Sequence, residues 1–150
     1  CKTGTLASLA AKVGSILGGA SKEEADKIAE IAANIGIGFQ IIDDVQNLTI
    51  GNPGKKRGDD IVEGKKSLPV ILHIEKNPEH KEQIGAFMSE ASKNGIESPA
   101  VENCIALLET SDCIQLAAKK GIDYIKENCA MLNSKIINDL FINMVPEVFR

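Results

Sequence analysis

Long hydrophobic runs are absent from this sequence: no apolar stretch approaches the roughly 20 residues that a helix needs to cross a bilayer. A strong excess of basic charge is also absent, because 17 basic side chains stand against 21 acidic ones, for a formal net charge of −4. Since a nucleic-acid-binding domain usually carries a basic face, that class is disfavoured. What is present is a chain of 150 residues, 43% of them hydrophobic, which suits one globular domain with a sizeable core.

Cysteine is sparse and widely spaced. The four cysteines are Cys1, Cys104, Cys113 and Cys129, and none forms a CxxC pair. This spacing argues against a disulfide framework or a zinc site and predicts reduced thiols in a cytoplasmic protein. The chain also lacks an initiator methionine and a charged-then-apolar leader. We therefore expect Cys1 to lie inside a longer gene product.

Strand-like alternation is missing, and helical periodicity and helix-boundary signals occupy nearly the whole chain. A first helix rich in small residues is expected over about 3–17. Ser21 and Glu24 form a capping box that predicts a long helix over about 22–48. The next helix is expected to start near Asp60 and to be ended or kinked by Pro69. Further helices are predicted over about 79–93, 99–109, 112–132 and 134–148, which together indicate an all-α helical bundle.

A narrow polar stripe runs along the predicted long helix within the segment "FQIIDDVQN". At about 100° per residue, its four members fall within an arc of roughly 100°; they are Gln40, Asp43, Asp44 and Asn47. An ordinary surface helix has a broader polar face, so we expect this helix to be buried on most sides, with the stripe facing a cavity. The two adjacent carboxylates repel each other, and an oxygen-only ligand set favours Mg²⁺ over zinc. The alternative is a solvated helix end, or carboxylates paired with buried arginines.

A basic, glycine-rich loop follows the stripe, in "GNPGKKRGDDIVEGKKSLP". Ammonium groups suit phosphate oxygens, and glycines let backbone N–H groups approach an anion. The loop does not fit the P-loop pattern, and loop lysines are most often simply solvated. The combination is more specific than either part: carboxylates suited to Mg²⁺ beside lysines suited to phosphate predict a diphosphate site in a helical bundle.

These segments resemble the second aspartate-rich region of the trans-polyprenyl diphosphate synthases, a family that includes the farnesyl and geranylgeranyl diphosphate synthases. Three motifs agree in order and spacing: "KTG" at the start, then "FQIIDDVQN", then "GKKRGDDIVEGKKSLP". The resemblance covers at least residues 1–75. It implies the C-terminal part of the family's all-α isoprenoid-synthase fold.

The resemblance also implies a metal site that uses Mg²⁺. Asp43 would be a direct ligand, Asp44 would support it directly or through water, and Asp60 matches an outer-shell acid. Gln40 would orient the acidic cluster. Asn47 departs from the family pattern, which has a third aspartate there, and this substitution resembles a eukaryotic-type geranylgeranyl synthase.

The diphosphate of the allylic substrate would be contacted by Lys2 and Lys65, with Thr3 nearby. A loop lysine has the same role in the family, and both Lys55 and Lys56 remain candidates, because each fits a different loop spacing. The implied reaction joins this allylic diphosphate to isopentenyl diphosphate. No Ser/His/Asp set is evident, and the two histidines, His73 and His80, are expected at the surface.

Members of the family are about twice this length, and their first aspartate-rich motif lies upstream of the segment seen here. We therefore expect residues 1–150 to be the C-terminal half of a synthase, inactive alone and homodimeric in the full-length enzyme. Product length is not decided, although Asn47 points toward geranylgeranyl. Two alternatives stay open: a non-catalytic regulatory subunit of a synthase, and a purely structural helical domain whose stripe is an ion-paired core.

Overall fold

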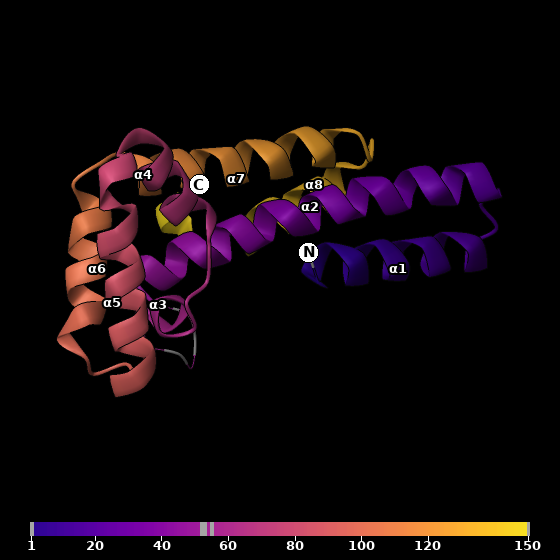
Figure 1. Cartoon of the computed structure of the whole chain (residues 1–150). Coiled ribbons are helices and arrows are strands. Elements are labelled where there is room, and N and C mark those ends of the chain that lie inside the picture. The colour runs from indigo at the N-terminus through magenta and orange to yellow at the C-terminus, as the bar shows by residue number, and fades with distance from the viewer. Residues whose placement is uncertain (1, 52–53, 55, 150) are drawn as a thin grey trace. The chain divides into compact units, whose positions relative to one another are not determined.

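The computed structural model describes residues 2–51, 54 and 56–149, and it is built from helices joined by short loops (Figure 1). In chain order the elements are α1 (Lys2–Leu17), α2 (Lys22–Leu48), α3 (Asp59–Val62), α4 (Leu68–Lys76), the 3₁₀ helix η1 (Pro78–His80), α5 (Lys81–Asn94), α6 (Pro99–Glu109), α7 (Cys113–Ala130), α8 (Lys135–Met144) and the 3₁₀ helix η2 (Glu147–Phe149). Within the described ranges there is no strand, which confirms the all-α prediction. None of the described helices combines the length and the apolar character that crossing a membrane requires.

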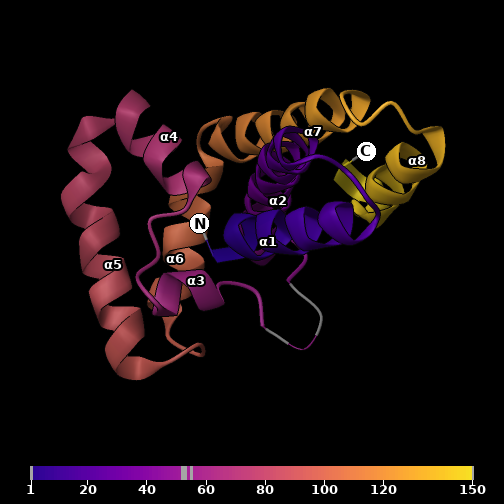
Figure 2. The ribbon, with the colours of Figure 1, turned by 90° about the vertical axis from the view of Figure 1, so that its right-hand side faces the viewer.

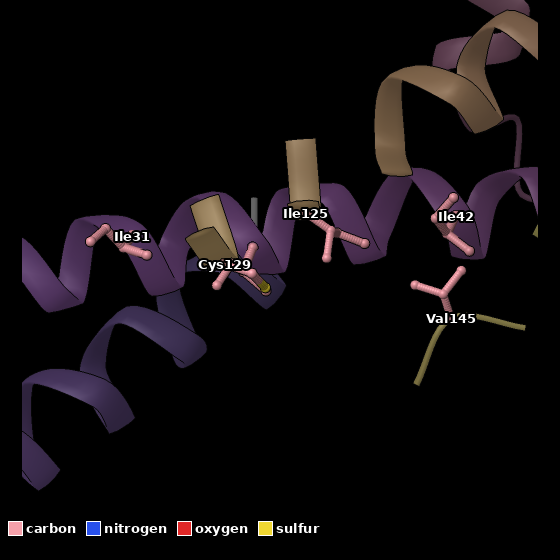
Figure 3. Packing of buried hydrophobic residues seen from close by; sticks show 6 residues of the cluster. Ile31, Ile42, Ile125, Cys129 and Val145 are labelled. Atoms are coloured by element: carbon pink, nitrogen blue, oxygen red, sulfur yellow. The ribbon is translucent and has the colours of Figure 1, made fainter. Parts of the chain in front are cut away.

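The chain divides into two compact units, one made of Cys1–Ile42 with Lys119–Arg150 and the other of Asp43–Ala118. In the first unit, α1, α7 and α8 lie around α2, which Figure 2 shows nearly end-on. Its core joins α2, α7 and the segment after α8 (Figure 3), and its buried members are Ile31, Ile35, Ile42, Ile125, Cys129 and Val145. Phe39 packs against this core, with its ring 6.1 Å from that of Phe141.

Glycines set how closely the helices of the first unit approach one another. A Cβ added at Gly4 of α1 would lie 2.9 Å from the Ala33 carbonyl oxygen of α2, and one added at Gly36 would lie 3.0 Å from the Gly4 Cα. A Cβ at Gly38 would lie 2.6 Å from Ile125 of α7. Any side chain at these positions would force the helices apart, so α2 is held between α1 and α7 by backbone contact.

In the second unit, α5 and α6 pack side by side, and α3 lies against both. Gly58, immediately before α3, has φ of 88°, and a Cβ there would lie 2.3 Å from Val101 Cγ1 of α6. The position therefore needs glycine for its backbone conformation and for space. Ser98 caps α6 by accepting a hydrogen bond from the Ala100 N–H, as its sequence predicts.

Two helix predictions are wrong. The helix expected to run from Asp60 to Pro69 is interrupted at Gly64, whose φ is 66°, and Pro69 lies in the first turn of a new helix, α4. Proline is tolerated there because the first turn does not need its N–H group. The last helix ends at Met144 rather than near 148, since Val145 precedes Pro146 and takes an extended conformation.

Candidate functional site

Three charged residues of the second unit, Asp44, Asp60 and Lys65, form a compact acid–lysine cluster. The Lys65 ammonium donates to Asp44 Oδ1 at 2.6 Å and to Asp60 Oδ2 at 3.0 Å. Both carboxylates are buried, with 9% of each side chain exposed, whereas 34% of the lysine side chain is exposed. Burial by itself lowers the pKa of Lys65, but the bonds to the two carboxylates outweigh it, so its pKa lies above the ordinary value. The lysine is therefore held charged and in place.

The turns around α3 bring these residues together. Asp44 lies near the end of α2, Asp60 lies in the first turn of α3, and the Lys65 N–H donates to the Asp60 carbonyl oxygen at 2.9 Å. The left-handed backbone of Gly58 and Gly64 lets the chain turn on either side of this short helix. The cluster thus depends on two glycines of the "GKKRGDDIVEGKK" segment.

Asn47 has a structural role that the sequence did not reveal. Its Oδ1 accepts a hydrogen bond from the Asp60 N–H at 3.1 Å, and its own carbonyl oxygen accepts one from the Gly58 N–H at 2.9 Å. The side chain is fully buried, and its amide nitrogen has no hydrogen-bond partner within the described part of the chain. Asn47 therefore ties the end of α2 to the start of α3, and its oxygen is already engaged.

The polar stripe is not uniform. Asp44 and Asn47 are buried, whereas Asp43 is exposed. Asp44 forms an ion pair with Lys65. Gln40 belongs to the first unit, where its Oε1 accepts a hydrogen bond from the Thr3 hydroxyl at 2.8 Å. Thr3 and the exposed Lys2 open α1 beside Gly4, the residue that contacts α2.

The basic loop is engaged elsewhere in the second unit. Lys56 forms an ion pair with Glu97, and both side chains are largely exposed. Arg57 donates to Glu109 at 3.0 Å, and Lys66 is exposed. The second lysine candidate of the loop, Lys55, lies outside the described residues. Because exposed ion pairs contribute little free energy, the pairing of Lys56 does not prevent it from exchanging Glu97 for a phosphate.

The prediction that both histidines lie at the surface is wrong for His73, which is completely buried in α4. His73 Nδ1 lies 2.8 Å from Ser111 Oγ, and His73 Nε2 lies 2.9 Å from His80 Nδ1, with the two rings stacked. Cys104, Cys113 and Cys129 are free thiols, as expected; the structure shows in addition that all three are buried, and burial raises the pKa of Cys104 to about 11. In the described part of the chain, the hydrogen bonds of His73 and Cys113 go to Ser111, His80 and Leu108 and not to the acid–lysine cluster.

The donor chemistry around the cluster suits a hard cation that keeps much of its water. Within residues 2–51, 54 and 56–149, no group of three His, Cys, Asp or Glu side chains is arranged to enclose a metal. Mg²⁺ typically uses only one or two carboxylates and takes its other ligands from water and substrate phosphates. Asp43 is exposed on α2, next to Asp44, which shares Lys65 with Asp60. The residues present therefore fit Mg²⁺ bound together with a phosphate.

Comparison with known proteins gives a consistent result. Residues 1–107 match the family model described as polyprenyl synthetase. The chain is 49% identical over 77 residues to a geranylgeranyl diphosphate synthase of Methanosarcina mazei, covering 50% of this chain and 24% of that protein. It is 32% identical over 114 residues to the putative chloroplastic geranylgeranyl pyrophosphate synthase 8 of Arabidopsis thaliana, covering 75% of this chain and 31% of that protein.

Solved structures agree over nearly the whole chain. The geranylgeranyl pyrophosphate synthetase of Pyrococcus horikoshii matches with a TM-score of 0.77 and 32% identity, covering 97% of this chain and 46% of that one. The heptaprenyl diphosphate synthase of Staphylococcus aureus matches with a TM-score of 0.68 and 28% identity, covering 96% and 45%. The chain thus spans about half the length of these solved proteins and matches a quarter to a third of the curated relatives. The chain belongs to the polyprenyl synthetase family.

Proposed function

We propose that this chain supplies the second aspartate-rich region of a geranylgeranyl-type polyprenyl diphosphate synthase, which joins an allylic diphosphate to isopentenyl diphosphate. The observation that carries the proposal is the Lys65 ammonium, held between two buried carboxylates in a segment that the family model matches. Both relatives described above are synthases by name, which favours an enzymatic role over a regulatory subunit or a structural domain.

Lys65 is suited to hold a departing diphosphate. An ammonium group has three N–H donors, of which Asp44 and Asp60 each take one. We assign the third N–H donor to a diphosphate oxygen, which would approach Lys65 from its exposed side. Because the two carboxylates fix the ammonium before the substrate arrives, little reorganisation is needed as negative charge develops on the leaving group.

The remaining roles follow the motif positions. Asp43 would hold Mg²⁺, with Asp44 and Asp60 as the supporting acids that orient Lys65. When bound, this ion neutralises charge on the diphosphate as the C–O bond breaks. Lys2 and one loop lysine, Lys55 or Lys56, would add positive charge, and Thr3 would keep Gln40 oriented through their hydrogen bond. A homodimeric full-length enzyme, a cytoplasmic location and the geranylgeranyl product length remain predictions.

Binding of inorganic pyrophosphate, measured by calorimetry with and without Mg²⁺, tests this proposal on the chain as it exists. The wild-type chain should bind pyrophosphate more tightly in the presence of Mg²⁺, and Asp43→Asn should weaken that binding by about 10–100-fold. Asp59→Asn is the matched control, because it removes the same charge at a nearby position that has no assigned role. Equal binding by the Asp43 and Asp59 variants, or binding that ignores Mg²⁺, would refute the assignment.

A further inference from the structure

Asn47 supplies the start of α3 with a cap from another helix. Gly58 occupies the N-cap position of α3 and has no side chain that could accept a hydrogen bond. The N–H of Asp60, in the first turn, therefore needs an acceptor from elsewhere. The Asn47 Oδ1 accepts this hydrogen bond at 3.1 Å, and the Asn47 carbonyl oxygen accepts one from the Gly58 N–H at 2.9 Å. The start of α3 is thus fixed to the end of α2 at two points.

The position of Asp60 in turn sets the position of the Lys65 ammonium. Asp60 holds Lys65 at both ends, because its Oδ2 accepts from the ammonium at 3.0 Å and its carbonyl oxygen accepts from the Lys65 N–H at 2.9 Å. Asp44 lies on α2 three residues before Asn47, and residues at this spacing share one face of a helix. Helix α2 therefore supports the cluster twice, directly through Asp44 and indirectly through Asn47 and Asp60. Loss of the oxygen at position 47 would release one of these two supports.

The neutral charge of the Asn47 side chain is as informative as its oxygen. Two carboxylates and one ammonium already give the acid–lysine cluster a formal charge of −1. An aspartate at position 47 could accept the same hydrogen bond without an N–H left over, whereas the buried Asn47 amide nitrogen has no partner among the residues that the structure describes. That aspartate would, however, bring a third buried carboxylate to the cluster, which would compete for the Lys65 ammonium.

We propose that Asn47 is a positioning residue for diphosphate binding: its oxygen holds Asp60, and through it Lys65, while its neutral amide leaves the third N–H donor of the ammonium to the diphosphate. This inference rests on the proposed function and adds a residue to it. An asparagine with a purely structural role would stabilise the fold without affecting the ammonium group or the affinity for pyrophosphate.

Asn47→Leu tests the oxygen, because it removes the acceptor and keeps a side chain of similar size. Calorimetry with inorganic pyrophosphate and Mg²⁺ should show binding that is weaker by about 10–100-fold, since Lys65 loses one of its supports. The matched control is Asn128→Leu, which removes a comparably buried, hydrogen-bonded asparagine from the first unit. Both variants should be less stable, but at a temperature where both are folded only the change at position 47 should weaken binding. Wild-type affinity in Asn47→Leu, or equal loss in both variants, would overturn the proposal.

Asn47→Asp separates the oxygen from the charge, because it keeps the acceptor and adds a carboxylate. Without Mg²⁺, this variant should bind pyrophosphate at least about tenfold more weakly than the wild type, owing to repulsion between the anions. With saturating Mg²⁺, which would neutralise the added charge, its affinity should return close to that of the wild type. The ratio of the two dissociation constants should therefore rise in Asn47→Asp and not in Asn128→Asp. An unchanged ratio would refute the role assigned to the neutral amide.

The ammonium group of the free chain gives a readout that needs no pyrophosphate. In the isotopically labelled wild type, two carboxylates should protect the Lys65 ammonium from exchange with water, which nuclear magnetic resonance detects. Asn47→Leu should lose this protection and Asn128→Leu should keep it. Equal protection in both variants, or none in the wild type, would overturn the positioning role.

The two proposals fail separately. Failure of the wild type to bind pyrophosphate would sink the proposed function. A wild type that binds, together with an Asn47→Leu variant that keeps both its affinity and its protected ammonium, would sink only the positioning role.

Discussion

At the scale of single residues, the position of Lys65 is the most informative feature of the second unit. Two buried carboxylates converge on one ammonium group, and removing that group would take away the positive charge that both share. Breaking a buried ion pair by deleting one partner costs about 3–5 kcal/mol, but the partial exposure of Lys65 lets water compensate some of the loss.

Lys65→Met should therefore lower the free energy of unfolding by about 1–3 kcal/mol and also weaken pyrophosphate binding. Urea denaturation followed by circular dichroism measures the first effect. Lys66→Met is the matched control, because the neighbouring lysine is exposed and the change in charge is the same. If the two variants were equally stable, the acid–lysine cluster would have no structural role.

His73 belongs to a chain of hydrogen bonds that has one fully satisfied arrangement. His80 Nδ1–H donates to His73 Nε2, His73 Nδ1–H donates to Ser111 Oγ, and the Ser111 hydroxyl donates to the Leu108 carbonyl oxygen, 3.3 Å away. In this arrangement the His73 ring is neutral, because its Nε2 accepts a hydrogen bond. Burial lowers the pKa of His73 and the adjacent His80 adds to this, while Glu79 acts in the opposite direction.

This shift predicts a stability that depends on pH. The unfolded chain takes up a proton near the ordinary histidine pKa of about 6.5, whereas folded His73 resists it. The contribution of His73 is therefore complete above that pH and is lost as the pH falls below it. Thermal unfolding at about pH 7.5 and about pH 5.5 should show a smaller difference for His73→Gln than for the wild type. An unchanged difference would mean that His73 does not cause the pH dependence.

At the scale of helices, the sequence predicts the ends of a helix well where the capping residues are neighbours in sequence. It predicts them poorly where the conformation of another part of the chain sets the end of the helix. The Ser21–Glu24 capping box forms, with the Ser21 N–H donating to Glu24 at 2.8 Å, and α2 begins and ends where predicted. Pro69 was misinterpreted because proline either ends a helix or begins one, and only the turn at Gly64 distinguishes the two. The burial of His73 was missed because its partners lie 7 and 38 residues away.

The same limit applies to the candidate site. The residue types and their order predict carboxylates beside lysines, and the structure does place three of the named residues together. Which lysine meets which acid depends on the turns at Gly58 and Gly64, so no helical wheel could assign Lys65 to Asp44 and Asp60. The tether formed by Asn47 likewise requires α3 to fold back onto the end of α2.

The contact between α1 and α2 offers a test with a control in the same helix. Gly4→Ala should destabilise the first unit by about 1–3 kcal/mol, because the new Cβ would lie 2.9 Å from a backbone oxygen that cannot move aside freely. Gly14→Ala should instead stabilise α1 by about 0.5–1 kcal/mol, since a Cβ there would meet no atom within 4 Å. Urea denaturation distinguishes the two outcomes, and equal effects of both changes would contradict the close helix contact.

At the scale of the whole molecule, the helical fold and the family are established, and the relatives that are synthases by name are about twice as long as this chain. The two units divide the motif residues, with Lys2, Thr3 and Gln40 in one and the acid–lysine cluster in the other. The expectation that residues 1–150 alone do not turn over, and that they form the C-terminal half of a synthase, remains a prediction.

We propose that the acid–lysine cluster and Asp43 together bind a diphosphate with Mg²⁺. The most direct measurement is a nuclear magnetic resonance titration of the isotopically labelled chain with inorganic pyrophosphate, with and without Mg²⁺. The resonances of the Lys65 ammonium and of the backbone amides of Asp43, Asp44 and Asp60 should shift at lower pyrophosphate concentrations when Mg²⁺ is present. Shifts confined to other residues, or identical shifts without Mg²⁺, would contradict it.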